Sequence, residues 1–404
     1  MHNIESLAIY DAVEEEVQRT TYPPSFPPLP AVPTGRYIDP QFFDLEMQHV
    51  WHKTWLTAGH ISELPKPGSY KLFEKLGQSI IISRGLDDEV RAFHNICRHR
   101  GAALLQEPTG TERRFVCPYH SWGYAIDGKL VSVPEAHNFA CLEKSENGLL
   151  PVRCETWRGM IFINLDDNAQ PLAEFFAPIT AETADFPFED LVVKDTVVVE
   201  MDCNWKAAYD NFLEIYHVNS IHKDTLAPYL DSKSFVVSLF KGGHARFVTR
   251  KKRGDTIFGT GLTLPHETTE RFKDHTVGLP FFPNGFTALD PIGFAWQTFW
   301  PVGPRKTIME APLLGWKIDT AEDRQFWTDT KANTLKILAE DTRLFAGIQR
   351  SLESGFLPSV MMGCQERALY WYQEEIDRKI GQANIPEHLR VTPVLEEHVG
   401  AQRR

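Results

Sequence analysis

Two patterns of hydrophobic and polar positions divide this chain. Between about residues 55 and 165, short runs rich in hydrophobic residues, such as "SYKLFEKLG", "QSIIISRG" and "VRAFHNI", are separated by Gly and Asp residues that are typical of turns. The Asp-Gly pair in "IDGKL" is a strong signal for a β-hairpin. We therefore predict a small all-β domain over residues 55–165.

A different pattern follows over residues 166–404. The strand-like run "DLVVKDTVVVEMDCNW" precedes "WKAAYDNFLEIYHV", which has helical spacing, and several β-rich runs lie between residues 233 and 312. The next run, "DRQFWTDTKANTLKILAEDTRLFAGIQRSLESG", predicts one long helix. Together they predict a larger α+β domain with helices on one face of an antiparallel sheet, so the fold class of the whole chain is α+β.

The first 54 residues fit neither pattern. The proline-rich run "TTYPPSFPPLPAVPTG" predicts an extended arm rather than a helix or strand. After it, the hydrophobic residues of "IDPQFFDLEMQHVWHKTW" have helical spacing. We predict that residues 1–54 form an arm and a helix that pack on the larger domain.

Composition and charge exclude several classes of protein. With 42% hydrophobic and 24% charged residues among 404, the chain is expected to fold rather than to be disordered. Its formal net charge of -12 argues against a nucleic-acid or anionic-membrane partner, since both need clustered cations. No run is long and apolar enough to span a bilayer, and the acidic N-terminus is unlike a signal peptide. The cytoplasm is therefore the expected location.

The segment "CRHRGAALLQEPTGTERRFVCPYH" contains two Cys–His pairs, Cys97-x-His99 and Cys117-x-x-His120. Thiolate and imidazole are the preferred ligands of zinc and of iron–sulfur clusters. Zinc-binding pairs usually enclose two to four residues, whereas Cys97 and His99 enclose one. A Rieske [2Fe–2S] centre, in which two Cys hold one iron and two His hold the other, fits this spacing better, and zinc remains the alternative.

A second group of titratable residues lies on the predicted helix that begins at Trp205. Asp210, Glu214 and His217 share one face of that helix, which is costly unless something binds them. His222 would point about 140° away from His217 on a continuous helix. Both can bind one metal only if the helix breaks between them, and we predict that break at Asn219–Ser220. The alternative is that the two histidines are unrelated surface residues.

A third candidate ligand lies on the long C-terminal helix. Asp341 is the one polar member of a stripe formed by Leu338, Asp341, Phe345, Ile348 and Leu352. A carboxylate in a buried stripe should be ionised only when it is paired or bound to a metal, so a structural ion pair with an arginine is the alternative to a metal ligand. The neighbouring Glu340 falls off this stripe and is expected to be solvated.

The motifs "CRHRGA" and "CPYHSWGY", the run "NWK…NFLEIYHV…H" and the late Asp resemble those of Rieske non-haem iron oxygenases, in the terminal oxygenase alpha subunit of the aromatic-ring-hydroxylating dioxygenase family. The resemblance extends from about residue 40 to 380. It implies that residues 55–165 are the Rieske domain and residues 166–404 the catalytic domain. The residues that it implies for the [2Fe–2S] cluster are Cys97 and Cys117 on one iron and His99 and His120 on the other. Those that it implies for mononuclear Fe(II) are His217, His222 and Asp341.

The same resemblance implies how such a protein works. Its members form trimers, and electrons from NAD(P)H arrive through a reductase, with or without a ferredoxin, for use with O2. The resemblance makes Glu214 the residue that bridges two subunits by hydrogen bonding a ligand histidine on each side. Asp210 would support the metal site from behind, or else lie on the helix surface.

We expect a terminal oxygenase that hydroxylates a small organic substrate, and we predict that this substrate is aromatic. The alternative is an N- or O-demethylating or quaternary-ammonium monooxygenase. Most ring dioxygenases have Asp where this chain has Glu214, and Glu is familiar in relatives that oxidise quaternary ammonium compounds. A plain electron carrier would have no use for the second set of ligands. The candidate pocket residues are aromatic, and we expect more than half of them to be ordinary core: Phe212, Phe240, Phe281, Phe282, Phe286, Phe294, Trp296, Phe299 and Phe345.

Overall fold

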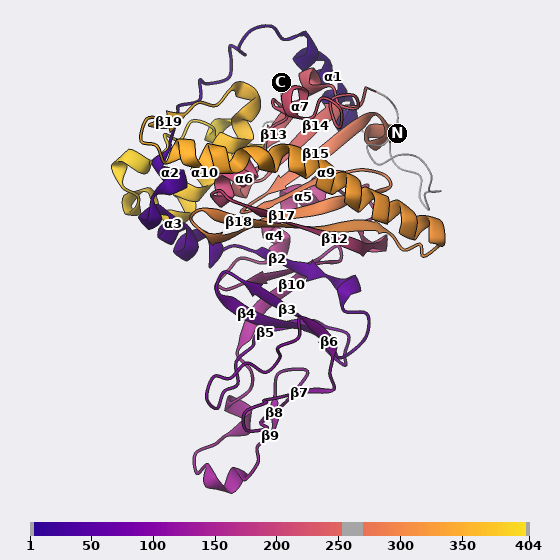
Figure 1. Cartoon of the computed structure of the whole chain (residues 1–404), viewed down its shortest axis with the longest axis vertical. Helices are drawn as coiled ribbons and strands as arrows, with labels where there is room; N and C mark the ends of the chain where they lie inside the picture. Colours follow the sequence, from indigo (N-terminus) through magenta and orange to yellow (C-terminus); the bar gives the residue numbers. More distant parts are fainter. Residues whose placement is uncertain (1–3, 253–269, 401–404) are drawn as a thin grey trace. The chain divides into compact units, whose positions relative to one another are not determined.

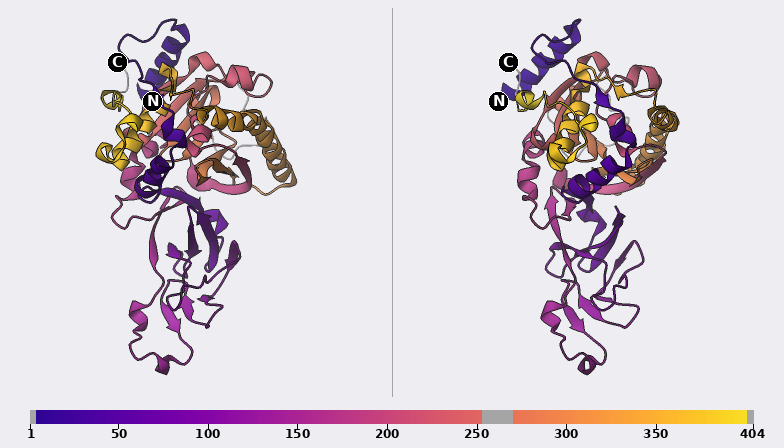
Figure 2. Two further views of the ribbon diagram at one scale, coloured as in Figure 1. Left: turned by 60° about the vertical axis from the view of Figure 1, so that its left-hand side comes forward. Right: turned by 90° about the vertical axis from the view of Figure 1, so that its left-hand side faces the viewer.

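The computed structural model describes residues 4–252 and 270–400. The chain forms two compact units (Figures 1 and 2). The larger unit combines residues 1–51 with residues 176–404, and the smaller unit, residues 52–175, is inserted between these two segments. Neither unit contains, in its described part, a helix long and apolar enough to cross a membrane.

The small unit is built almost entirely of antiparallel strands. One seven-stranded sheet has the order β2-β11-β10-β5-β4-β3-β6, and β7, β8 and β9 form a second, three-stranded sheet. The elements of this unit are β2 (Leu56–His60), β3 (Ser69–Lys75), β4 (Gln78–Arg84), β5 (Val90–His94), β6 (Thr109–Thr111), β7 (Arg114–Val116), β8 (Gly123–Ala125), β9 (Leu130–Ser132), β10 (Pro151–Trp157), β11 (Met160–Asn164) and α4 (Leu172–Phe175). The predicted hairpin at "IDGKL" joins β8 to β9.

Local sequence explains the strand pairing in this unit. The turn between β3 and β4 places Leu76 and Gly77 at φ 56° and 70°, as a two-residue turn that matches the twist of the strands requires. In β4, the successive residues Ile80, Ile81 and Ile82 are all buried, so this central strand is covered on both faces. An all-β domain is therefore confirmed for this part of the chain.

The larger unit is built on a seven-stranded antiparallel sheet with the order β12-β18-β17-β16-β15-β14-β13. Its strands are β12 (Leu191–Met201), β13 (Val236–Leu239), β14 (Ala245–Arg250), β15 (His275–Phe281), β16 (Gly285–Leu289), β17 (Gly293–Gly303) and β18 (Lys306–Trp316). The short strands β1 (Val32–Pro33) and β19 (Ser359–Val360) pair separately. The α+β class and the antiparallel sheet are as predicted.

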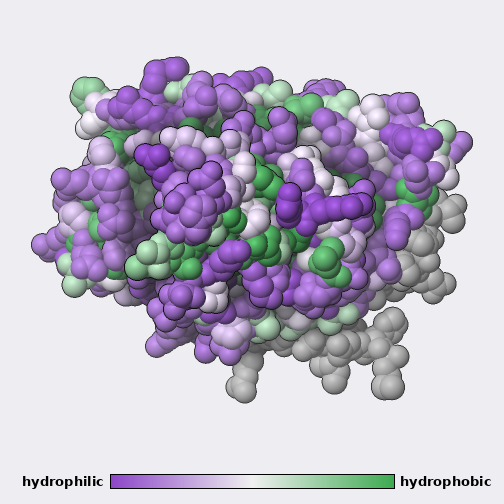
Figure 3. Space-filling view, turned by 90° about the horizontal axis from the view of Figure 1, so that it is seen from below, coloured by the Kyte–Doolittle hydropathy of each residue, from purple (hydrophilic) through white to green (hydrophobic). Residues whose placement is uncertain are grey.

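Helices complete the larger unit. The long helix α9 (Ala321–Leu352) packs against β12 and crosses the sheet in Figure 1. The other helices are α1 (Ile4–Gln18), α2 (Gly35–Ile38), α3 (Pro40–Glu46), α5 (Ala177–Glu182), α6 (Trp205–Asp210), α7 (Val218–Ile221), α8 (Glu270–Asp274) and α10 (Arg367–Ile380). A polar surface is in keeping with the net charge, and Figure 3 shows one face on which hydrophilic side chains predominate.

The prediction that one helix beginning at Trp205 carries Asp210, Glu214 and His217 on one face is wrong. The helix α6 ends at Asp210, and α7 begins only at Val218. Between them, the Glu214 carboxylate accepts the backbone N–H groups of Tyr216 and His217, a local turn that competes with continued helix. The predicted break at Asn219–Ser220 is also wrong, because both residues lie inside α7.

The N-terminal segment is tied into the larger unit by buried ion pairs. Arg36, on α2, lies 2.6 Å from Asp377 of α10, and Glu46, at the end of α3, lies 2.7 Å from Lys206 of α6. The side chains of Glu46 and Lys206 are fully buried. Removing one partner of such a pair leaves an uncompensated buried charge, which typically costs about 3–5 kcal/mol.

Candidate functional site

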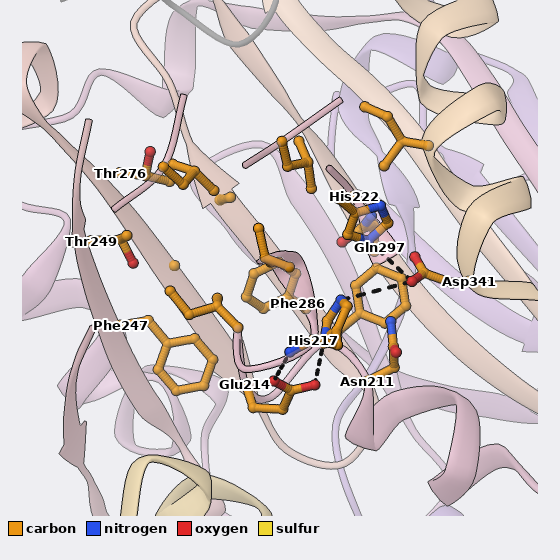
Figure 4. A pocket seen from close by; sticks show the side chains of 18 of the residues that line it. Asn211, Glu214, His217, His222, Phe247, Thr249, Thr276, Phe286, Gln297 and Asp341 are labelled. Atoms are coloured by element: carbon orange, nitrogen blue, oxygen red, sulfur yellow. Dashed lines mark hydrogen bonds and ion pairs between the residues drawn. The ribbon is translucent and has the colours of Figure 1, made fainter. Parts of the chain in front are cut away.

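The short helix α7 brings two histidines to one place. His217 immediately precedes α7 and His222 immediately follows it, so that their rings meet with centroids 5.2 Å apart (Figure 4). Asp341 of α9 faces both rings: its Oδ1 lies 3.0 Å from His222 Nε2 and 3.7 Å from His217 Nε2. These three residues can each offer one ligand atom within 4.8 Å of the others, which suits a single metal ion with open coordination positions.

Asp341 lies on the buried face of α9, as predicted, together with Leu338, Phe345 and Leu352. The assignment of Ile348 to this face is wrong: its side chain is 41% exposed, and Gln349 is buried instead. The reason is helical pitch. A straight helix has 3.6 residues per turn, so a strict alternation of three and four residues drifts off the buried face.

A carboxylate contacts the Nδ1 atom of each histidine ring, on the side opposite the Nε2 atom that faces the centre of the site. His222 Nδ1 donates to Glu340 Oε2 over 2.7 Å, and Thr225 Oγ1 donates to the same oxygen. His217 Nδ1 contacts the Glu214 carboxylate in the same way. With its proton on Nδ1, each ring presents the Nε2 lone pair to the centre of the site. Glu340 is therefore not a solvated residue, and that expectation is wrong.

The electrostatics of His222 reflect these neighbours. Burial lowers its pKa, but the nearby Asp341 and Glu340 carboxylates raise it by more, so that the net pKa lies above the ordinary value. Negative charge around an imidazole favours any cation at that position, whether a proton or a metal ion. The site is thus electrostatically suited to a divalent metal.

A cavity of about 200 Å³ opens beside the three candidate ligands. Strands β14 to β17 form one wall, and α7 and α9 contribute to the other. Four phenylalanines line it: Phe212, Phe235, Phe247 and Phe286. Phe212 and Phe286 were among the predicted pocket residues, whereas Phe235 and Phe247 were missed. The alternation of residues along a strand does not indicate which face of the sheet lines a cavity.

In the small unit, two loops bring the Cys–His pairs together. Cys97 and Cys117 each form the same backbone pattern: the carbonyl of each accepts from the residue four positions on, and its N–H donates to the residue five positions on. The two loops are therefore local copies of one another despite their different Cys–His spacing. His99 and His120 face each other with ring centroids 4.6 Å apart.

The chemistry of this set fits an iron–sulfur cluster. Both cysteines are buried and free, and His99 Nδ1 is buried without a hydrogen-bond partner among the described residues. A ligand nitrogen of this kind is ready to bind a metal. Tyr124 lies behind the cluster site, with its hydroxyl 3.4 Å from Cys97 Sγ, and Trp122 stacks on the His99 ring.

Comparisons with known proteins identify both units. The family model "Ring hydroxylating alpha subunit (catalytic domain)" matches residues 188–382, and "Rieske [2Fe-2S] domain" matches residues 54–144. The chain is 33% identical to the glycine betaine monooxygenase oxygenase subunit of Pseudomonas aeruginosa (strain UCBPP-PA14), over 89% of this chain and 92% of that protein. The chain belongs to the Rieske non-haem iron oxygenase alpha subunits. It is therefore an oxidoreductase with a Rieske [2Fe–2S] domain and a candidate His-His-Asp mononuclear iron site, rather than a zinc protein.

Other relatives of this oxygenase act on different substrates. The carnitine monooxygenase oxygenase subunit of Escherichia coli (strain K12) is 34% identical, over 80% of this chain and 84% of that protein. The structure of naphthalene 1,2-dioxygenase from Rhodococcus sp. bound to indole superposes with a TM-score of 0.71 at 19% identity, covering 96% of this chain and 100% of that one. The fold alone therefore does not select the substrate.

Asp210, the last residue of α6, is half-buried in the oxygenase's larger unit, with its carboxylate shielded from solvent. Tyr37 OH donates to its Oδ2 over 2.7 Å, while its Oδ1 is buried and has no hydrogen-bond partner in the described structure. Burial raises the pKa of Asp210 to about 7. The residue does not line the cavity, and its position between α6 and the N-terminal segment does not match the alternative of an exposed helix-surface residue.

Proposed function

We propose that this oxygenase removes an N-methyl group from a quaternary ammonium compound by monooxygenation. A quaternary-ammonium substrate is the alternative prediction of the sequence analysis, and the prediction of an aromatic substrate has less support. The observation that carries the proposal is the charge of the cavity. Its described lining residues include the carboxylates of Glu214 and Asp341, a third carboxylate, Asp290, that is paired with the buried Lys251 behind it, and no lysine or arginine.

The phenylalanines of the cavity favour the same substrate class. Ring centroids are 4.9 Å apart for Phe235 and Phe247, 6.2 Å for Phe247 and Phe286, and 6.1 Å for Phe212 and Phe286, so the four rings form one continuous row. The face of an aromatic ring attracts a cation, by about 0.5–2 kcal/mol for each ring in contact. An aromatic acid would instead need a cation to balance its charge, and the described lining offers none.

The proposed reaction balances as follows. One N-methyl C–H bond becomes C–OH, one atom of O2 enters the product, and the other leaves as water after two electrons and two protons are taken up. The hydroxymethyl group then leaves as formaldehyde, with release of one proton and a tertiary amine. His217, His222 and Asp341 would hold the Fe(II) ion, which would supply oxygen activation, and the [2Fe–2S] cluster would supply the electrons.

The side chains of the chain set up this chemistry. Glu214 and Glu340 would keep the protons of the two ligand histidines on Nδ1 and orient their rings. The apolar wall of the cavity would exclude bulk water and place the methyl carbon beside the open coordination positions. The candidate cluster ligands in the small unit remain Cys97, His99, Cys117 and His120.

An oxygenase subunit of this family implies a reductase partner that takes electrons from NAD(P)H. A ferredoxin between the two remains part of the proposal, as does a homotrimer in which Glu214 bridges two subunits. Tyr216, two residues after Glu214, supports a subunit boundary there, because its large side chain is 77% exposed in the single chain. Sedimentation equilibrium of the purified protein tests the trimer.

Oxygen uptake and formaldehyde release test the function. We expect both with glycine betaine, carnitine or tetramethylammonium as substrate, and neither with benzoate or an aromatic sulfonate. The Asp341→Ala variant is the control for metal-dependent turnover. Dihydroxylation of an aromatic compound, without formaldehyde release from any quaternary ammonium compound, would overturn the proposal.

A further inference from the structure

Buried tryptophan and tyrosine rings form a continuous row in the larger unit, which we call the aromatic path. Its successive members, with the distances between their ring centroids, are Trp300 and Trp51 (5.9 Å), Trp51 and Trp205 (4.9 Å), Trp205 and Tyr372 (5.9 Å), and Tyr372 and Tyr209 (5.5 Å). Trp300 lies two residues before Val302, whose side chain is 58% exposed, so this end of the path approaches the surface. At the other end, the Phe299 ring contacts those of Tyr209 and Phe212, with centroids 5.4 and 4.7 Å away, and Phe212 lines the cavity. The aromatic path therefore leads to the cavity beside the candidate metal ligands.

A further tyrosine is connected to this path through a carboxylate. Tyr37 OH donates to Asp210 Oδ2 over 2.7 Å, and Asp210 directly follows Tyr209 in α6. The two tyrosines are therefore joined by one peptide unit and one hydrogen bond. Tyr209 OH itself donates to a backbone carbonyl, that of Gly285. Tyr372 OH has no hydrogen-bond partner within the described structure. Of these three tyrosines, Tyr37 is the one that donates to a carboxylate.

The hydrogen bond between Tyr37 and Asp210 determines which tyrosine is oxidised most readily. Tyrosine and tryptophan lose an electron more easily than other aromatic side chains, and an oxidised phenol also loses its proton. A carboxylate in contact with the hydroxyl group can take up that proton, whereas a backbone carbonyl is too weak a base to do so. Burial raises the pKa of Asp210 to about 7, so above neutral pH its carboxylate is ionised and is a stronger base than an ordinary aspartate. An oxidised state is therefore stabilised best at Tyr37.

The charges around Tyr37 suit this step. Loss of an electron from Tyr37 and transfer of its proton to Asp210 take the pair from one negative charge to none, so no unbalanced positive charge arises in the interior. The nearby cations Lys206 and Arg36 are each balanced by a carboxylate, Lys206 by Glu46 at 2.7 Å and Arg36 by an aspartate of α10 at 2.6 Å. Neither cation therefore opposes oxidation of the Tyr37 ring with its full charge.

We propose that Tyr37 and Asp210 form a redox-active pair that protects the oxygenase when the candidate iron site is oxidised with no substrate in place. Tyr37 gives one electron, by way of Tyr209, to the oxidising equivalent left at that site, and its hydroxyl proton passes to Asp210. One electron is gained at the iron site for each electron lost at Tyr37. A reductant in solution, such as ascorbate, then returns one electron through the aromatic path, and Asp210 returns the proton. This inference goes beyond the proposed function, because it does not depend on which substrate is oxidised.

The test uses the whole enzyme, loaded with its cluster and Fe(II), in the absence of substrate. The enzyme is mixed with hydrogen peroxide at pH 8, where the Asp210 carboxylate is ionised, and is frozen at once for electron paramagnetic resonance. Ring-deuterated tyrosine, supplied during expression, distinguishes a tyrosyl from a tryptophanyl radical. We expect a tyrosyl radical in the wild type and its loss in Tyr37→Phe.

A second variant and a matched control separate this role from packing. Asp210→Asn keeps the tyrosine and an acceptor for its hydrogen bond, but the amide cannot take up the proton, so the radical should be lost here too. The control is Tyr370→Phe on α10. Tyr370 is buried as Tyr37 is, but its OH donates to the backbone carbonyl of Thr392, so this variant should give the wild-type radical.

Mass spectrometry of the same samples gives an independent readout. Oxidising equivalents that do not reach Tyr37 attack the side chains nearest to the iron site, so oxidation of Phe212 and Phe286 should rise several-fold in Tyr37→Phe and stay at the wild-type level in Tyr370→Phe. Three results would each overturn the inference: no tyrosyl radical in the wild type, the same radical in Tyr37→Phe, or equal oxidation of the cavity residues in Tyr37→Phe and the wild type.

Discussion

Replacing Asp210 with asparagine should stabilise this oxygenase above neutral pH. The amide oxygen of asparagine can accept the Tyr37 hydroxyl as Oδ2 does, so the one hydrogen bond of this side chain is kept. What the change removes is a buried negative charge. Burial is the main cause of the raised pKa of Asp210, and Glu366 and Glu214 add to it, while Tyr37 and Lys206 favour the anion.

The magnitude follows from the shift. An acid whose pKa is raised in the folded state binds more protons folded than unfolded, so stability falls as pH rises from the ordinary pKa of 3.8 through about 7. Full ionisation then costs about 4 kcal/mol, at 1.36 kcal/mol for each unit, and about 2.5 kcal/mol of this cost arises between pH 5 and pH 8. Asp210→Asn removes that part of the pH dependence.

The assay is urea unfolding of matched, iron-loaded samples at several pH values from 5 to 8. The free energy of unfolding of Asp210→Asn relative to wild type should grow by about 2.5 kcal/mol across this range. Tyr37→Phe is the second variant: it removes the donor that favours the anion, so the loss of stability should continue to higher pH than in the wild type. Parallel pH dependence of Asp210→Asn and wild type would refute the reasoning.

Three further substitutions test the site. Glu340→Gln should weaken Fe(II) binding about 10- to 100-fold, because His222 loses a carboxylate partner. Dialysis against an iron chelator measures the change. The control is Glu322→Gln, on the exposed first turn of the same helix. Gly278→Ala would place a methyl group 3.2 Å from two phenylalanine side chains of the cavity, so kcat/KM should fall more for a trimethylammonium substrate than for a dimethylamine. Asp341→Ala should abolish turnover while the visible absorption of the Rieske cluster remains; turnover in this variant would contradict the assignment of Asp341.

The sequence predicted the parts of the site that depend on local spacing. Cys97, His99, Cys117 and His120 lie in two short loops, where ligand spacing is nearly the whole geometry, so the motif itself contains the arrangement. Asp341 was found because one acid interrupts a hydrophobic stripe on a long helix. Both signals are local in sequence.

One error arises from a local side-chain contact, and the other from a contact with a distant part of the chain. The run from Trp205 to Val218 has helical spacing, yet α6 ends at Asp210, and the Glu214 carboxylate accepts the backbone N–H groups of Tyr216 and His217 in a local turn. Glu340 lies off the stripe of Asp341, but His222, from a distant part of the chain, approaches α9 from that side. The adjacent acids at 340 and 341 were a signal that could have indicated Glu340 as well as Asp341.

The insertion of the small unit into the larger one has a consequence for biosynthesis. Residues 52–175 leave the ribosome as one uninterrupted stretch, so this unit can fold and acquire its cluster early. The larger unit must wait, because Arg36 pairs with a residue 341 positions later in the chain. A truncated product that ends before α10 would therefore contain the complete small unit, but its larger unit would lack the partner of Arg36 and could not complete its fold.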